Sequence, residues 1–102
     1  MAESFLARNR KVMLTDQFIE DAYKLAAAGN YDSVIIQMAG VAKGTWYKWL
    51  KEGGSLLEDE NYEPAQNYSD EMKEKMAKLY YYVRLGQAEA EDKAVQMIQL
   101  NS

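Results

Sequence analysis

The sequence contains no cysteine, no histidine and only one proline. Without cysteine there is neither a disulfide framework nor a thiolate metal site, and without histidine the commonest general base and zinc ligand is missing. We therefore expect no enzymatic activity, no cofactor and no bound metal. The chain also has no run of about eighteen apolar residues, and its first fourteen residues lack the apolar core of a signal peptide. These two absences predict an intracellular protein that does not span a membrane.

The charge of this short chain is unevenly distributed. With 102 residues it can bury one modest core and is too short for two ordinary domains. Residues 1 to 53 hold seven basic and six acidic side chains, whereas residues 54 to 102 hold five and ten, which together give the net charge of −4. The N-terminal half can therefore approach a polyanion, and the C-terminal half repels one.

Basic side chains gather at two places in the N-terminal half. One cluster, at the start, consists of Arg8, Arg10 and Lys11, and the other consists of Lys43, Lys48 and Lys51. Residues 1–14 would form a basic arm along a DNA backbone or minor groove, or a frayed terminus. Either cluster also fits an ordinary solvated face.

The first helix is expected directly after this arm. Thr15 and Asp16 suit the N-cap and first turn of a helix over residues 16–28, because a hydroxyl caps free amides and a carboxylate favours the positive end of the dipole. Gly29 and Asn30 would end that helix.

A second, shorter helix is expected over residues 32–39, capped by Asp32 or Ser33. Its apolar face would consist of Val34, Ile35 and Met38. Gly40 follows and suits a tight turn, because glycine readily adopts the left-handed conformation.

A third helix is expected over residues 42–52, ended by Gly53 and Gly54. Two short helices around a glycine turn are the organisation of a helix-turn-helix, which we assign to residues 15–54. At about 100° per residue, Trp46, Trp49 and Leu50 fall on one side of this third helix and should lie in the core.

The opposite side of the same helix would face DNA. In a helix-turn-helix the second helix enters the major groove, and its N-terminal residues lie nearest the bases and phosphates. Lysine supplies charge that phosphates attract, and hydroxyl groups supply hydrogen bonds. The residues expected at the DNA surface are Lys43, Gly44, Thr45, Tyr47, Lys48 and Lys51.

The C-terminal half is expected to contain an acidic connector and a long helix. Residues 55–68 include the proline and show no periodicity, so they form the connector. Over residues 69–102, apolar positions alternate spacings of four and three, which is typical of a helix that packs against another. This seam consists of Met72, Met76, Leu79, Val83, Gly86 and Ala90. Tyrosines 80, 81 and 82 flank it, either docked on the core or in an oligomer contact.

These motifs resemble a known family. The run AAAGNYDSVIIQMAGVAKGTWYKWLKEGG, followed after the connector by LGQAEAEDKAVQMI, is similar to the N-terminal part of bacteriophage small terminase subunits of the helix-turn-helix type. In that family a GNY helix opening, a glycine turn, a TxYxWL recognition helix and an AEAE helix occur in this order. The resemblance covers residues 15–98. Ala42 stands where this motif usually has serine or threonine, so no side-chain cap is expected there.

The resemblance implies a function in viral genome packaging. Such a protein recognises viral double-stranded DNA, assembles into a ring-like homo-oligomer in the host cell cytoplasm, and delivers the DNA to a large terminase subunit with ATPase and nuclease activities. Contact with the large subunit would come from a region outside this chain. The residues that would face DNA are Lys43, Gly44, Thr45, Tyr47 and Lys48. The residues that would begin the oligomerisation region are Met72, Met76, Leu79, Val83 and Ala90.

Two other functions fit the same residues. A phage or mobile-element transcription regulator could use the same recognition helix as a symmetric dimer, and would then require palindromic half-sites about one DNA turn apart. A protein-interaction module could use the acidic half and the tyrosines without binding DNA, since a helix-turn-helix alone does not establish DNA binding.

Overall fold

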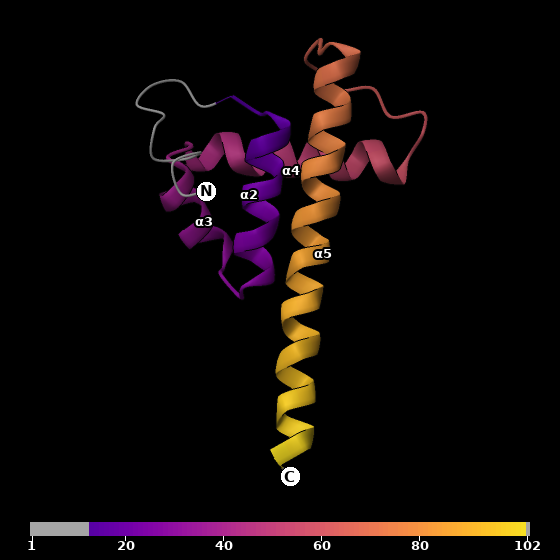
Figure 1. Ribbon diagram of the computed structural model, residues 1–102. Coiled ribbons are helices and arrows are strands. Elements are labelled where there is room, and N and C mark those ends of the chain that lie inside the picture. Colours follow the sequence, from indigo (N-terminus) through magenta and orange to yellow (C-terminus); the bar gives the residue numbers. More distant parts are fainter. Residues whose placement is uncertain (1–12, 102) are drawn as a thin grey trace.

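A computed structural model of the protein describes residues 13–101, and the side chains of residues 13–96. In this part the chain forms helices and no strand, which confirms an all-α fold. The helices, labelled as in Figure 1, are α2 (Asp16–Ala27), α3 (Asp32–Ala39), α4 (Lys43–Glu58) and α5 (Asp70–Asn101). The basic cluster of Arg8, Arg10 and Lys11 lies outside the described residues.

The start of α2 forms as its sequence predicts. Thr15 is the N-cap, and its hydroxyl accepts a hydrogen bond of 3.1 Å from the amide of Phe18. Asp16 stands in the first turn, at the positive end of the helix dipole. The helix ends at Ala27, and Gly29 follows with φ +96°, so the predicted glycine stop is confirmed.

The predicted turn between α3 and α4 is also present. Gly40 ends α3 in the left-handed conformation, with φ +70°. Ala42 precedes α4 without a side-chain cap, as expected. The N-cap of α3 is Tyr31 rather than the expected Asp32 or Ser33, and it makes no side-chain cap bond.

The apolar face predicted for α3 is wrong in part. Ile35 is fully buried, but Val34 is 37% and Met38 is 47% exposed. The helix is only eight residues long, and the side that packs inward is completed by Ala39. Two large apolar side chains of α3 therefore face solvent.

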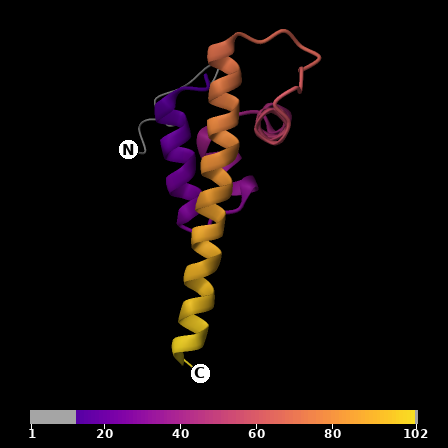
Figure 2. The same cartoon turned by 90° about the vertical axis from the view of Figure 1, so that its right-hand side faces the viewer.

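Helices α2 and α5 lie side by side and run in the same direction, and α4 crosses α5 steeply (Figures 1 and 2). At the start of both parallel helices, Lys75 pairs with Asp16 at 3.3 Å. Further along, the hydroxyl of Tyr23 donates a hydrogen bond to Glu89. The core lies between these three helices.

Aromatic side chains from α2 and α4 fill much of that core. Phe18 and Trp46 are fully buried, and Trp49 is nearly so. The Phe18 ring meets Trp49 edge-on at 5.7 Å between centroids, and Trp46 at 6.3 Å. The prediction that both tryptophans point inward is confirmed, and their positions fix which side of α4 remains outside.

Helix α4 is longer than its sequence predicts, because Gly53 and Gly54 do not end it. The helix continues through both glycines to Glu58. A Cβ atom added to Gly53 would lie 2.1 Å from the carbonyl oxygen of Met76, and one added to Gly54 would lie 2.9 Å from the Tyr80 ring. The glycines therefore allow α4 and α5 to touch, and the connector is confined to residues 59–69.

The seam on α5 packs within the chain itself. Met76, Leu79 and Val83 are fully buried in the core, so these three side chains pack against helices of the same chain. Met72 is partly buried against the same core, and Ala90 is half-buried. The fully buried positions of this seam belong to the core that α5 forms with α2 and α4.

The tyrosines beside the seam divide between the core and the surface. Tyr80 packs against the core, whereas Tyr81 and Tyr82 are exposed.

The C-terminal part of α5 projects beyond the other helices (Figure 1), and the side chains of residues 91–96 are exposed. Between residues 13 and 101, no helix combines the length and the apolar character that crossing a membrane requires.

Candidate nucleic-acid interface

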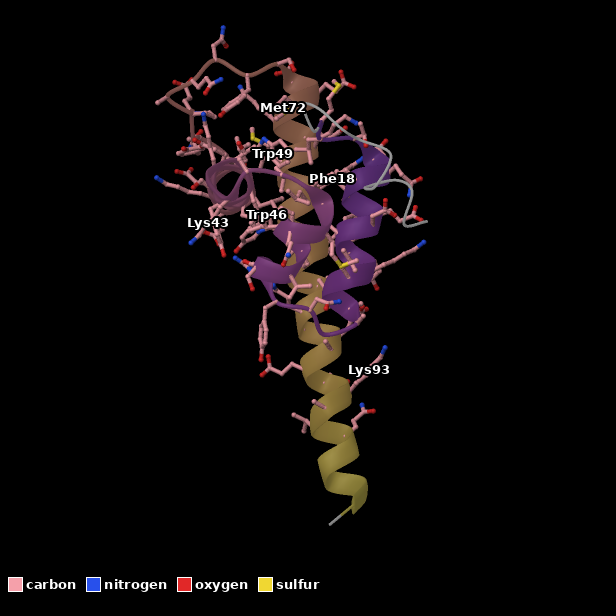
Figure 3. The ribbon with its side chains drawn as sticks, turned by 90° about the vertical axis from the view of Figure 1, so that its left-hand side faces the viewer. Phe18, Lys43, Trp46, Trp49, Met72 and Lys93 are labelled. Carbon is pink, nitrogen blue, oxygen red and sulfur yellow. The ribbon has the colours of Figure 1, made fainter. Side chains whose placement is uncertain are left out.

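The outward face of α4 carries the residues that the sequence assigns to DNA binding. Lys43, Gly44, Tyr47, Lys48 and Lys51 are exposed, and Lys43 points away from the protein in Figure 3. Thr45 is half-buried beside them. The structure therefore brings all six predicted residues of α4 to one helix, with five of them accessible.

The lysines on this face have no acidic partner within the part of the chain that the structure describes. Elsewhere, a carboxylate lies within 4.0 Å of the ammonium groups of Lys24, Lys75 and Lys78. Among the side chains of residues 13–96, none forms an ion pair with Lys43, Lys48 or Lys51. In a chain with net charge −4, α4 thus keeps a local positive charge that a phosphate can neutralise.

The start of α4 adds to this positive potential. Both α2 and α3 begin with an aspartate in the first turn, but α4 has no acidic residue there. Ala42 provides no side-chain cap, and a Cβ atom added to Gly44 would meet nothing within 4 Å. No described side chain therefore caps the first turn, where the helix dipole favours an anion.

The connector folds back onto α4 at Lys48, which the sequence did not predict. The Lys48 ammonium donates a hydrogen bond of 2.6 Å to the side-chain oxygen of Gln66 and lies 5.9 Å from the centre of the Tyr68 ring. Both partners are uncharged, so neither neutralises the Lys48 ammonium. A DNA phosphate that takes the place of Gln66 would gain a charge-assisted hydrogen bond.

A second contact holds the connector near the other end of α4. The hydroxyl of Tyr62 donates a hydrogen bond to Glu52. This bond, together with partial burial and the negative charge of Glu52, raises the pKa of Tyr62 above its ordinary value. The Glu52 carboxylate is thereby engaged by the connector.

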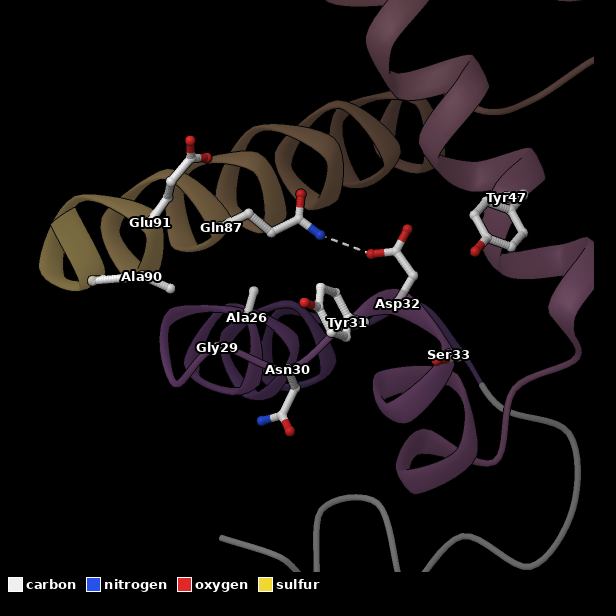
Figure 4. A pocket seen from close by; sticks show the side chains of 11 residues that line it. Ala26, Gly29, Asn30, Tyr31, Asp32, Ser33, Tyr47, Gln87, Ala90 and Glu91 are labelled. Atoms are coloured by element: carbon white, nitrogen blue, oxygen red, sulfur yellow. Dashed lines mark hydrogen bonds between the residues drawn. The ribbon is translucent and has the colours of Figure 1, made fainter. Parts of the chain in front are cut away.

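A different groove, of 780 Å³, lies between α5 and the junction of α2 and α3 (Figure 4). Among the described residues, its lining includes Asp32 and Glu91 and no lysine or arginine. Gln87 donates a hydrogen bond of 2.7 Å to Asp32 across it. The groove therefore repels a polyanion, and no group of three or more acidic side chains in the described part of the chain is arranged to hold a metal ion.

Comparisons with known proteins add no relative. No family model, no curated protein and no solved structure matches this chain. Its function therefore has to be inferred from its own residues and their arrangement.

Proposed function

We propose that α3, the turn at Gly40 and α4 act as a helix-turn-helix that binds duplex DNA. We further propose that the protein is the DNA-recognition component of a viral genome-packaging machine, similar to a small terminase subunit. The observation that carries the DNA-binding proposal is the exposed face of α4, whose lysines form no ion pair with residues 13–96. The other side of this helix is fixed in the core by Trp46 and Trp49.

The mode of DNA recognition follows from the residue types on α4. Helix α4 contains no arginine, asparagine or glutamine, the side chains that make most bidentate contacts with bases. Its lysines and the hydroxyl of Tyr47 suit phosphates instead. We therefore expect much of any sequence preference to come from DNA shape and deformability.

The packaging role rests on the order of motifs quoted above. In this role the protein would bind viral DNA and present it to the large terminase subunit that cuts and translocates it. A transcription regulator would bind through the same face of α4, so the two roles differ in the arrangement of sites on DNA. Palindromic half-sites about one turn apart would indicate a two-fold dimer.

The DNA-binding proposal is tested by fluorescence anisotropy. Increasing concentrations of the intact chain are added to a labelled duplex of about 20 base pairs, which spans about two DNA turns, at several salt concentrations. The logarithm of the binding constant should fall steeply with the logarithm of salt concentration. In the double variant Lys43→Ala/Lys48→Ala the magnitude of this slope should decrease by about 1.8, which is about 0.9 for each lost phosphate contact.

A matched control removes the same charge elsewhere. Lys24→Ala/Lys78→Ala deletes two lysines that pair with Glu20 and Glu74, and it should leave the salt slope close to that of the unmodified protein. Equal effects of the two double variants would show that only net charge matters. Absence of binding at low salt would refute the DNA-binding proposal.

A protein-binding function is the second candidate, because α3 exposes apolar side chains. Tyr31 is 81% exposed, and Val34 and Met38, three and seven positions further along the chain, are also at the surface. Exposed apolar groups of this kind are typical of contact sites when they adjoin one another. A chain that fails to bind DNA would favour this function, and polar substitutions at Val34 and Met38 would then abolish partner binding.

A further inference from the structure

A groove of 440 Å³ lies between α4 and α5, beside the outward face of α4. Tyr47 and Lys51 of α4 line it, and Tyr80 and Arg84 of α5 line it as well. Arg84 was not among the residues that the sequence assigned to DNA binding, because it belongs to a helix far along the chain. The fold brings this cation to the same groove as Lys51.

Among the described residues, the groups that orient Arg84 are neutral. Its guanidinium lies 5.4 Å from the centre of the Tyr80 ring, and its Nη1 donates a hydrogen bond of 2.8 Å to Gln87. Gln87 is itself held by its bond to Asp32 at the start of α3. No carboxylate among residues 13–96 forms an ion pair with Arg84. The guanidinium is therefore held in place while its charge stays unneutralised.

This arrangement suits a phosphate. A guanidinium has five N–H donors in a planar fork, and Gln87 takes up only one of its nitrogens. The remaining donors match the two oxygens of a phosphodiester, which arginine binds bidentately. The hydroxyl of Tyr47 and the ammonium of Lys51 border the same groove and offer further donors.

We propose that Arg84 of α5 contacts the DNA backbone in this groove, together with Lys51 and Tyr47 of α4. The inference rests on the proposed DNA binding by α4. A helix in the major groove has a phosphate backbone on each side of it, and α5 crosses α4 so that Arg84 lines the groove beside Lys51. The DNA surface thus extends beyond the helix-turn-helix to a residue of the long helix.

One acidic residue in the same groove gives a test of opposite sign. Glu58, at the end of α4, lines the groove with Lys51 and Arg84. Its carboxylate repels an approaching phosphate and weakens the contact. Removing this negative charge should therefore strengthen DNA binding, whereas removing Arg84 should weaken it.

The experiment measures the salt dependence of duplex binding by the intact chain. Arg84→Ala should weaken binding and decrease the magnitude of the salt slope by about 0.9, the value for one phosphate contact. Arg84→Lys should keep the slope but bind less tightly, because lysine cannot make the bidentate contact. Glu58→Gln should bind more tightly than the unmodified protein.

Lys93→Ala is the matched control. Lys93 also lies exposed on α5, but on the projecting part of the helix, away from Lys43 and the rest of α4 (Figure 3). Its removal changes the net charge as Arg84→Ala does and should leave the slope unchanged. Thermal melting of each variant checks that folding is retained.

The outcomes separate this inference from the proposed function. If Arg84→Ala has the salt slope of the unmodified protein while Lys43→Ala/Lys48→Ala flattens it, the inference is overturned and DNA binding by α4 stands. If Lys93→Ala and Arg84→Ala have equal effects, the inference is also overturned, because net charge alone explains both. If the unmodified protein binds no duplex, the proposed function fails and the inference fails with it.

Discussion

Replacing Gly53 with alanine should destabilise the protein, although alanine is the better helix former. Alanine is favoured over glycine by about 1 kcal/mol in the interior of a helix. At Gly53, however, the added Cβ would lie 2.1 Å from the carbonyl oxygen of Met76 and 3.1 Å from the Cβ of Tyr80. The first neighbour is backbone of α5, so the two helices have to move apart by roughly 1 Å in a close-packed core.

Overpacking typically costs about 1–3 kcal/mol and occasionally more, and a clash with the backbone of α5 places Gly53→Ala near the upper end, at about 3 kcal/mol or slightly above. After the gain in helix propensity, the net loss should be about 2–3 kcal/mol, out of a typical total of 5–15 kcal/mol. This corresponds to a fall in Tm of roughly 8–24 °C for a domain of this size. Thermal unfolding followed by circular dichroism at 222 nm measures it.

Gly44→Ala is the matched control for this prediction. Gly44 lies on the same helix, but an added Cβ would meet nothing within 4 Å and its φ is not positive. Alanine should therefore stabilise the protein there by about 0.5–1 kcal/mol. If Gly53→Ala were as stable as Gly44→Ala, α4 and α5 could not be in contact at Gly53, and the reasoning would be refuted.

Three further predictions concern the core, the cap of α2 and the connector. Trp46→Ala should lower the free energy of unfolding by roughly 3–5 kcal/mol, measured by urea denaturation, and a stability close to that of the unmodified protein would mean that Trp46 is not in the core. Thr15→Ala removes the cap bond to Phe18 and should cost about 1 kcal/mol in the same assay; no change would show that the bond contributes nothing. Glu52 raises the pKa of Tyr62, so the stabilisation from their bond should be complete below about pH 10 and lost as pH rises through the raised pKa. Absorbance at 295 nm measures tyrosine ionisation, and the difference between the unmodified protein and Tyr62→Phe isolates Tyr62. Tyr62 should ionise at a higher pH in the unmodified protein than in Glu52→Gln; identical titrations of these two proteins would exclude the bond in solution.

Local signals predicted much of this fold because they act within a few residues. Thr15 caps α2 through an amide three positions away, and Gly40 forms the turn through its own backbone conformation. The spacing of Trp46 and Trp49 sets the buried side of α4 and therefore its outward lysines. In each case the cause and the effect lie close together in the sequence.

The features that the sequence did not predict depend on contacts between distant segments. In the sequence, Gly53 is typical of a helix end. In the structure, its lack of a side chain instead allows the backbone of α5 to come close to α4. The spacing of Met76 in the sequence fits packing against another chain as well as packing within this chain. Its complete burial in the structure shows that it packs within this chain. The contact of Lys48 with Gln66 and the position of Arg84 beside α4 likewise arise from the fold.

Helix α5 links the stability of the protein to the proposed DNA surface. Its buried side supplies Met76, Leu79 and Val83 to the core that holds α4 in place, while its flank carries Arg84 to the groove beside α4. A substitution on the buried side can therefore weaken DNA binding by unfolding the protein, whereas one at Arg84 acts through charge. Because unfolding abolishes all binding and loss of one phosphate contact changes the salt slope by only about 0.9, the salt slope distinguishes the two causes where affinity alone does not.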